Sequence, residues 1–225
     1  HNDFYKVVTN AATAWLYGCS SVNCSMLGIG ERTGNCPLEA MVIEYCSLRG
    51  TTDGMDLSAI TEIGEKSFMN CVSLGTVIFN GPVVTIHHHG FEGCSNLTSV
   101  VFAGELPTGF SIGVRGFANC SKLSDLSTVL SVINVLSDEA LLNCTSLGGS
   151  FTTPKKFHEL GNFALSGTQM TDIYLDMLDA NLAPNALSGL TSATTVHFTT
   201  FTESIARKRY GSILDNTDAT LLFLE

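Results

Sequence analysis

The sequence predicts an α/β solenoid of about six stacked coils, and three observations support this fold class. Four cysteines recur at steps of 23, 26 and 24 residues, at Cys71, Cys94, Cys120 and Cys144. A short segment of alternating apolar residues follows each of them, as expected for strands. Hydrophobic residues make up 44% of the 225 residues and charged ones 14%, so the chain is folded and is neither disordered nor a coiled coil.

The repeating unit can be read in four stretches, "IGEKSFMNCVSL", "IHHHGFEGCSNL", "IGVRGFANCSKL" and "LSDEALLNCTSL". Each has Ile or Leu, then a small residue, then Phe or Leu, and finally Cys and Leu at regular intervals. Two weaker copies follow, with Thr168 and Leu190 near the Cys position. The part between Ile and Cys has helical spacing over only about two turns, which predicts a short helical or 3₁₀ segment.

The segments expected to form strands are "LEAMVI", "LGTVIF", "LTSVVF", "LSDLST", "LGGSFT", "MTDIYL" and "ATTVHF". On each strand the fourth and sixth residues point inward and the fifth points outward. Thr128 occupies one of the inward places, and Gly148, Gly149 and Pro154 weaken the next strand. We therefore predict a parallel sheet that is irregular or broken near residues 124–154.

These motifs together are similar to a known repeat. The pattern L-x-x-V-x-F followed by I-G-x-x-[A/S/G]-F-x-x-C-x-x-L resembles the BspA-like, or treponemal-type, leucine-rich repeat, over about residues 38–198. The resemblance implies a curved solenoid with its parallel β-sheet on the concave face. It also implies export to the cell surface, the periplasm or the extracellular space, and a role in adhesion or another protein contact. Pro82 and Pro107 lie away from the strand end where the family commonly has a proline.

The chain is expected to have three parts: an N-terminal cap over residues 1–37, the solenoid over 38–198 and a C-terminal cap over 199–225. A helix over 204–213 and a final strand in "ATLLFLE" are predicted for the C-terminal cap. The chain opens on His1 rather than Met, so we expect a form from which any signal peptide has gone. No apolar run reaches the roughly 18 residues needed to span a bilayer.

Charge and motifs narrow the function. A net charge of -10 disfavours nucleic acid and anionic membranes as partners. The stretch "GIGERTG" has one residue too many for a dinucleotide fingerprint and is interpreted as a loop. The sequence lacks G-x-S-x-G, H-E-x-x-H and a phosphate loop, so we predict a non-enzymatic protein without a cofactor.

The cysteines divide into two sets. Those of the repeat are expected to form a buried column of free thiols, because free Cys packs as a small hydrophobe. The others, Cys19, Cys24, Cys36 and Cys46, precede the regular repeats. They could form two disulfides, with three possible pairings, or remain free thiols; a zinc site is the least favoured because no C-x-x-C is present.

Three consecutive histidines, His87, His88 and His89, raise the possibility of a metal site. They stand where sister copies carry Gly, Glu, Lys, Val and Arg, which indicates a solvated turn. A dedicated metal site needs three or four converging ligands with their own support. We therefore expect no metal here.

The remaining candidate is the outward column of the concave sheet, which is unusually apolar. Either β-propensity or a contact surface explains such a column. We predict that it binds a protein partner, from a host or from the same organism's envelope. The alternative is a small hydrophobic or lipid-like ligand, in a pocket opened by the break and walled by Phe151 and Tyr174. The candidate surface residues are Val42, Thr76, Ile78, Ser99, Val101, Asp125, Phe151, Asp172, Tyr174 and His197.

Overall fold

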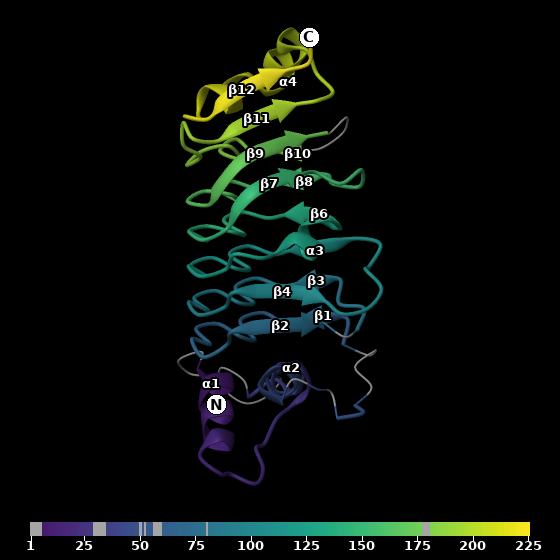
Figure 1. Ribbon diagram of the computed structural model, residues 1–225, viewed down its shortest axis with the longest axis vertical. Coiled ribbons are helices and arrows are strands. Elements are labelled where there is room, and N and C mark those ends of the chain that lie inside the picture. Colours follow the sequence, from purple (N-terminus) through teal and green to yellow (C-terminus); the bar gives the residue numbers. More distant parts are fainter. Residues whose placement is uncertain are drawn as a thin grey trace.

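The computed structural model is an upright stack of coils with helices at both ends (Figure 1). It describes residues 6–28, 35–49, 51, 53–55, 60–79, 81–176 and 181–225. The helices are α1 (Val7–Leu16), the 3₁₀ helix η1 (Met26–Gly28), α2 (Leu38–Arg49), α3 (Ser127–Leu130) and α4 (Glu203–Asp215). The strands are β1 (Glu62–Ile63), β2 (Thr76–Phe79), β3 (Thr85–Ile86), β4 (Ser99–Phe102), β5 (Phe110–Ile112), β6 (Ile133–Leu136), β7 (Gly148–Thr152), β8 (Glu159–Leu160), β9 (Gln169–Leu175), β10 (Asn181–Leu182), β11 (Thr195–Phe198) and β12 (Thr220–Phe223).

One side of the stack, the rear wall, is a single parallel sheet in the order β1-β3-β5-β6-β8-β10. Most of these strands are short, and each places at least one Ile or Leu in the core, as Ile63, Ile86 and Ile112 do at 0% exposure. These are the apolar residues that open each copy of the repeat. The sequence predicted a single sheet, and this second sheet was missed because two-residue strands are too short to show alternation.

The opposite side, the front wall, contains the strands that the sequence predicted. It is split into a two-stranded sheet, β2-β4, and a four-stranded sheet, β7-β9-β11-β12. All pairs are parallel, and the register aligns equivalent positions of successive coils, for example Val77 with Val100. The predicted break near residues 124–154 is therefore confirmed.

The break itself is a short helix. The Asp125 carboxylate accepts hydrogen bonds from the amide and the hydroxyl of Ser127, at 3.1 and 2.8 Å, and α3 follows. Helical spacing then lets Leu126 and Val129 reach the core. Thr128, which looked misplaced on a strand, accepts the Phe102 amide through its hydroxyl at 3.4 Å. The helical turn thus provides core residues at a spacing that a strand would have sent to solvent.

A third side of each coil, the turn side, joins the rear wall to the front wall. The expected helical or 3₁₀ segments appear as successive turns, with 3₁₀-type bonds such as Gly90 N to His87 O at 3.1 Å. A continuous helix does not form, because alternate amides bond the next coil: Phe91 donates to Gly116 O at 2.7 Å and Phe117 to Ala140 O at 2.9 Å. His89 and Asn119, whose backbones are left-handed, also donate their amides to the next coil.

Columns of identical side chains fill the core. Phe68, Phe91 and Phe117 stack with centroids 4.7 and 5.1 Å apart and with rings 6° and 8° from parallel. Beside them the Cys94 thiol donates to Phe68 O at 3.0 Å, and Cys120 donates to Phe91 O at 3.1 Å. The repeat cysteines are buried and free, as predicted. At the Cys position, the buried thiol thus donates a hydrogen bond to a backbone carbonyl of the coil below.

The N-terminal helices pack below the first coil, where α2 contacts β2 (Figure 1). The segment "LEAMVI", predicted to be a strand, instead begins α2, so that prediction is wrong. Ala40, Met41, Ile43 and Cys46 are buried at helical spacing, and Glu39 and Arg49 suit the two ends of the helix dipole. At the other end, the helix expected over 204–213 is α4, and the final strand is β12.

Candidate binding surface

The outward face of the front wall gathers most of the predicted surface residues, and α3 divides them into two patches. The lower patch lies on β2 and β4, where Ile78 pairs with Val101 and the Ser99 hydroxyl lies 3.3 Å from that of Thr76. Ile78 is 38% exposed and Val101 is half-buried. Asp125, at the upper border of this patch, is exposed and accepts the Ser127 amide at the start of α3.

The upper patch lies on the four-stranded sheet. The rings of Tyr174 and His197 stack with centroids 4.2 Å apart and 14° between their planes. The Nε2–H of His197 donates to Asp172 Oδ1 at 2.9 Å. Hydrogen bonds from His197 and then from Thr171 hold the pKa of Asp172 below its usual range. This bond and the stack fix both rings on a rigid sheet.

Two predicted surface residues are misplaced. Val42 was expected to point outward from a strand, but it lies half-buried on α2 beside Trp15 and Tyr45. Phe151 was expected at the surface, yet it is 2% exposed and meets Phe157 edge-on at 6.1 Å. The cause is a register shift between Gly149 and Ser150, which moves every later residue of β7 to the other face.

Strand pairing identifies two surface residues that the sequence did not predict. Thr152 takes the outward place beside Tyr174, and Leu222 of β12 pairs with His197 and is 49% exposed. The adjacent glycines Gly148 and Gly149 were the feature of the sequence that could have indicated the outward position of Thr152. Leu222 was visible only as part of a final apolar strand, because its register follows from the strand pairing.

Phe151, predicted to wall a pocket at the break, faces the core instead. A pocket of about 540 Å³ lies instead among the N-terminal helices. Its lining is largely apolar and includes Val22, Leu38 and Met55. The remaining lining residues are Trp15, Asn23, Cys24, Met41, Val42 and Tyr45.

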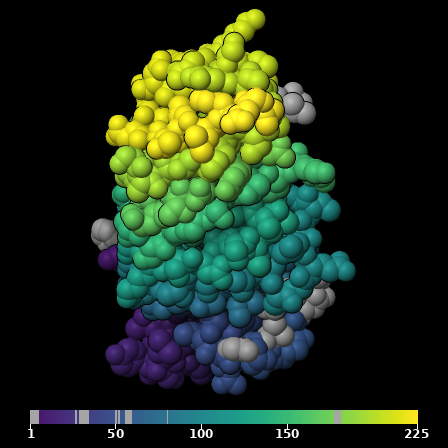
Figure 2. Space-filling view, turned by 45° about the horizontal axis from the view of Figure 1, so that its top comes forward, coloured from purple at the N-terminus to yellow at the C-terminus, as the bar shows by residue number. Residues whose placement is uncertain are grey.

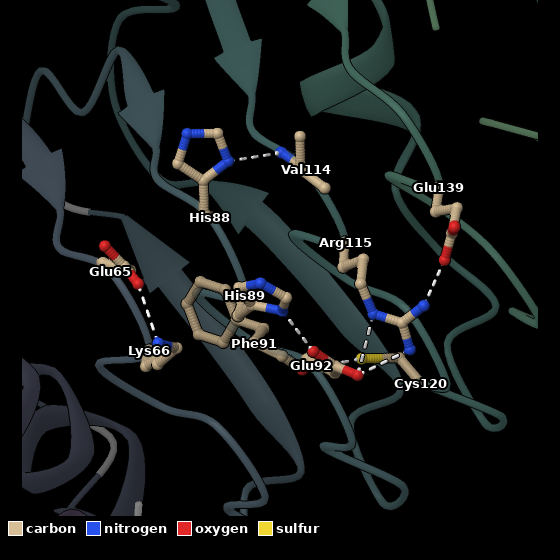
Figure 3. Close-up of polar contacts among 10 residues, drawn as sticks. All are labelled: Glu65, Lys66, His88, His89, Phe91, Glu92, Val114, Arg115, Cys120 and Glu139. Atoms are coloured by element: carbon tan, nitrogen blue, oxygen red, sulfur yellow. Dashed lines mark hydrogen bonds and ion pairs between the residues drawn. The ribbon is translucent and has the colours of Figure 1, made fainter. Parts of the chain in front are cut away.

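The three histidine side chains make separate contacts, and Figure 3 shows those of His88 and His89. His87 donates to Glu62 at 2.9 Å, His88 accepts the Val114 amide at 3.2 Å, and His89 donates to Glu92 at 2.5 Å. Among the described residues, no three His, Cys, Asp or Glu side chains are grouped to hold a metal ion. The turn is therefore less solvated than expected.

Glu92 begins a charged ladder that joins three coils on the turn side (Figure 3). Arg115 donates to Glu92 at 2.7 Å and also to Glu139. Burial acts to raise the pKa of Glu92, but the hydrogen bonds from Arg115 and His89 outweigh it and lower that pKa. The ladder is structural, because its charges are already satisfied by one another.

The four N-terminal cysteines are free, so the disulfide alternative is not realised in this structure. Cys19 is exposed, Cys24 is half-buried, and Cys36 and Cys46 are buried. Burial, with Cys24 close by, raises the pKa of the Cys36 thiol to about 12.

Within the described part of the chain, no helix is long and apolar enough to cross a bilayer.

Parallel rungs with a buried Ile or Leu, Phe or Leu, and Cys in successive coils define a leucine-rich repeat solenoid. Residues 61–194 match the family model described as BspA type leucine rich repeat region, in six copies. This match covers more than half of the chain, which therefore belongs to the BspA-type leucine-rich repeat family. The resemblance and the number of coils predicted from the sequence are confirmed.

A solved structure supports the fold. A leucine rich cell surface protein from Faecalibacterium prausnitzii A2-165 matches with a TM-score of 0.50 and 22% sequence identity. The match covers 60% of this chain and 42% of that one. At this identity the likeness concerns the fold alone.

The N-terminal segment has a different similarity. Residues 1–66 match the HMGL-like family model. The Citrate (Re)-synthase of Clostridium kluyveri is 66% identical over 65 residues, and that of Syntrophus aciditrophicus is 59% identical over 63 residues. These matches cover 29% and 28% of this chain but only 14% and 10% of the two synthases.

Sequence reasoning missed this similarity. The stretch "GIGERTG", interpreted as a loop, lies inside the matched segment, and its residues 29–34 are outside the described residues. One indirect indication was present in the sequence, because the complete repeat pattern does not occur before Ile63. The segment is similar to another family, and this similarity was found by comparison.

Proposed function

We propose that the chain is a non-enzymatic, exported protein-interaction scaffold that holds a partner on the outward face of its front wall, chiefly at the upper patch. The observation that carries this proposal is the stack of Tyr174 on His197, held by Asp172. Rigid, half-exposed aromatic side chains on a sheet act as binding anchors, because little conformational entropy is lost when a partner covers them. The family, and the similarity to a leucine rich cell surface protein of Faecalibacterium prausnitzii, support export.

The composition of the front wall favours a protein over other partners. Its strands β2, β4, β7, β9, β11 and β12 contain no Lys or Arg. A net charge of -10 would repel nucleic acid and anionic lipid. Half-exposed Tyr174 and Val101 beside hydroxyl groups instead provide the mixture of apolar and polar groups found in protein interfaces.

The test is a pull-down against host matrix proteins and envelope proteins of the organism that makes the chain. Tyr174→Asp should abolish capture of the partner, whereas Ile78→Asp should weaken it if the lower patch contributes. Asn119→Asp, on the exposed turn side, is the matched control and should leave capture unchanged. Melting curves establish that each variant is folded. If Tyr174→Asp captures as much partner as the native chain, the upper patch is not the binding site.

The alternative, an apolar ligand, is now better placed in the pocket among the N-terminal helices. That pocket combines about 540 Å³ with the side chains of Trp15, Met41 and Tyr45. Native mass spectrometry of the protein purified without detergent should show an added mass if this alternative holds. Val42→Trp would fill the pocket and remove that mass.

For the N-terminal segment we propose a capping role, as the sequence predicted for residues 1–37, here extended to include α2. Its support is the packing of α2 on β2 and the burial of Met41 and Ile43. The segment corresponds to only 14% of the Clostridium synthase, so we do not expect it to form citrate alone. An assay for citrate formation tests this, and measurable synthesis would contradict the non-enzymatic proposal.

A further inference from the structure

The end of the stack formed by the last strand differs from the rest of the front wall. β12 is the outermost strand of the four-stranded sheet, in the order β12-β11-β9-β7. Figure 1 places it at the top of the stack, and Figure 2 shows the last residues running across that end of the molecule. Within the described residues, no strand lies beyond it.

Some backbone amides of β12 do not bond β11. Thr220 donates to Thr194 O at 2.9 Å, and Leu224 donates to Phe201 O at 3.0 Å, both toward the β11 side. In a parallel ladder alternate residues bond the same neighbour, so the amides of Leu221 and Phe223 point away from β11. Such an open edge can accept an additional strand.

The side chains of β12 are also incompletely covered. Phe223 stacks on Phe198 at 5.2 Å, but it remains half-buried, whereas Phe198 is 2% exposed. Leu221 likewise sits half-buried above Val196, which is 0% exposed. The last side chain of each of these two inward columns is therefore only partly buried. Pro and Lys, which commonly protect an edge, are absent from "ATLLFLE".

The charges near β12 indicate which kind of strand could pair with its edge. Asp218 and Glu225 are exposed and flank the two ends of the strand. A second copy paired antiparallel, with Thr220 opposite Phe223, would place Asp218 opposite Glu225 twice, which is repulsive. Two basic side chains of α4 are already engaged: Arg207 with Glu203 and Asp215, and Arg209 over the rings of Phe201 and Tyr210.

We propose that the free edge of β12 binds an extended apolar segment of a partner protein that carries Lys or Arg at both ends. Such a segment adds one rung to the sheet through the amides of Leu221 and Phe223. Its alternate apolar side chains cover the two unfinished columns, and its basic ends meet Asp218 and Glu225. This site uses the edge of the sheet and adjoins the upper patch, which lies on the face of the same sheet; Leu221→Pro tests the edge and Tyr174→Asp tests the patch.

The test uses the full chain and two labelled peptides, Lys-Gly-Val-Thr-Val-Thr-Val-Gly-Lys and the same peptide with Glu at both ends. Fluorescence anisotropy at low salt should show binding of the Lys peptide at least tenfold tighter than that of the Glu peptide. Asp218→Asn with Glu225→Gln should reduce this preference to less than threefold. Equal affinities for the native chain would overturn the charge argument.

A pair of variants separates backbone pairing from side-chain contact. Leu221→Pro removes an amide that points away from β11, where proline is tolerated, while Leu221→Ala keeps that amide and loses a similar packing contact. The Lys peptide should bind Leu221→Pro at least fivefold more weakly than Leu221→Ala, with both variants melting close to the native chain. Equal binding to the two variants would overturn strand addition. Sedimentation showing a dimer that Leu221→Pro dissolves would assign the edge to a second copy and overturn the proposed partner.

Discussion

The repeats and the N-terminal helices differ in whether their buried polar groups are hydrogen-bonded and in whether their apolar side chains are covered. In the repeats the buried hydroxyls of Thr168 and Thr194 donate to Leu165 O and Met170 O, each at 2.8 Å. In the N-terminal segment, Ser25 Oγ and Glu44 Oε2 are buried and have no hydrogen-bond partner among the described residues. Tyr17, by contrast, is 89% exposed.

This difference indicates that the two parts of the chain suit different surroundings. Each coil of the repeat meets a nearly identical coil above and below, so every position has a defined partner. The N-terminal segment instead resembles one piece of much longer synthases, in which other residues would surround it. Here α2 packs against the first coil, and the described part of the segment carries buried polar atoms without a partner and exposed apolar side chains.

The largest expected effect belongs to the repeat core. Phe91→Ala removes the middle ring of the three-ring stack and leaves a cavity at a position with 0% exposure. We expect a loss of about 3–5 kcal/mol in the free energy of unfolding, measured by urea denaturation. Phe163→Ala, at a ring position 37% exposed, is the matched control and should cost under about 1 kcal/mol. Similar losses in both would mean that the stacked column is not the core of the repeat.

The second prediction concerns the N-terminal helices. Glu44 is 2% exposed, and burial raises the pKa of its carboxyl. Its folded state therefore holds a proton more tightly than its unfolded state, a contribution that is complete below the unfolded pKa and is lost as pH rises. Glu44→Met should stabilise the protein by about 1–3 kcal/mol at pH 7, with a smaller gain near pH 4. Urea denaturation at both pH values measures the gain.

Glu105→Met, in an exposed loop, is the control for this change and should have little effect. A Glu44→Met variant less stable than the native chain at pH 7 would show that Glu44 is satisfied, and that the two regions do not differ as described.

The third prediction uses the buried thiols of the repeat. Burial raises the pKa of Cys71 from 9.0 to about 12, and those of Cys94 and Cys144 well above 9.0. The unfolded thiols ionise first, so this stability is present below about pH 9 and falls as pH rises toward 12. In Cys71→Ala the slope of stability against pH should be shallower by at most about 1.4 kcal/mol per pH unit.

Thiol labelling checks the same contrast at pH 8. Cys19 is exposed and should react with a disulfide reagent at once, whereas Cys94 and Cys144 should react only after unfolding. Rapid reaction of the repeat thiols in the folded protein would contradict their burial.

A smaller effect is expected at the break in the front wall. Asp125→Ala removes the carboxylate that accepts the Ser127 amide at 3.1 Å and the Ser127 hydroxyl at 2.8 Å, so the start of α3 loses two hydrogen bonds. We expect a loss of about 1 kcal/mol and faster hydrogen exchange of the Leu130 amide. Asp218→Ala, which is exposed and lies outside the helices, should change neither quantity. Unchanged exchange in Asp125→Ala would mean that α3 forms without these two hydrogen bonds.

The smallest effect concerns the charged ladder. Arg115→Met should cost less than about 1 kcal/mol, because Glu92 keeps its hydrogen bond from His89 and the Glu139 side chain is 35% exposed to solvent. The lowered pKa of Glu92 contributes stability above its unfolded pKa, and that contribution is lost as pH falls. The difference between the variant and the native chain should therefore shrink in acid and in 1 M salt. A loss that grows in acid would contradict this assignment.

The sequence predicted the features of the repeat that recur and missed those that occur once. Phe91, Cys94 and Leu97 could be placed in the core because equivalent letters return in successive coils. The break could be expected from Gly148 and Gly149, but its effect on Phe151 could not, since one inserted residue reverses the facing of all that follow. Helix α2 was misread because "LEAMVI" satisfies both the strand pattern and a helical one.

The candidate site followed the same division. Tyr174, His197 and Asp172 lie together on one face, as strand alternation predicts. Their stacking and hydrogen bond depend on the register between β9 and β11, which fixes side-chain pairs that spacing along the chain leaves open. Val42 was misplaced because the repeat was extended back into the segment that resembles the synthases.

Photocrosslinking from two positions tests the central claim most directly. A benzophenone amino acid is placed at position 174 on the upper patch or at position 119 on the turn side, and the protein is irradiated with the envelope or matrix extract used for capture. The account predicts a crosslinked partner from position 174 and none from position 119. A partner crosslinked from position 119 alone would contradict it, because contact would then occur on the turn side of the solenoid.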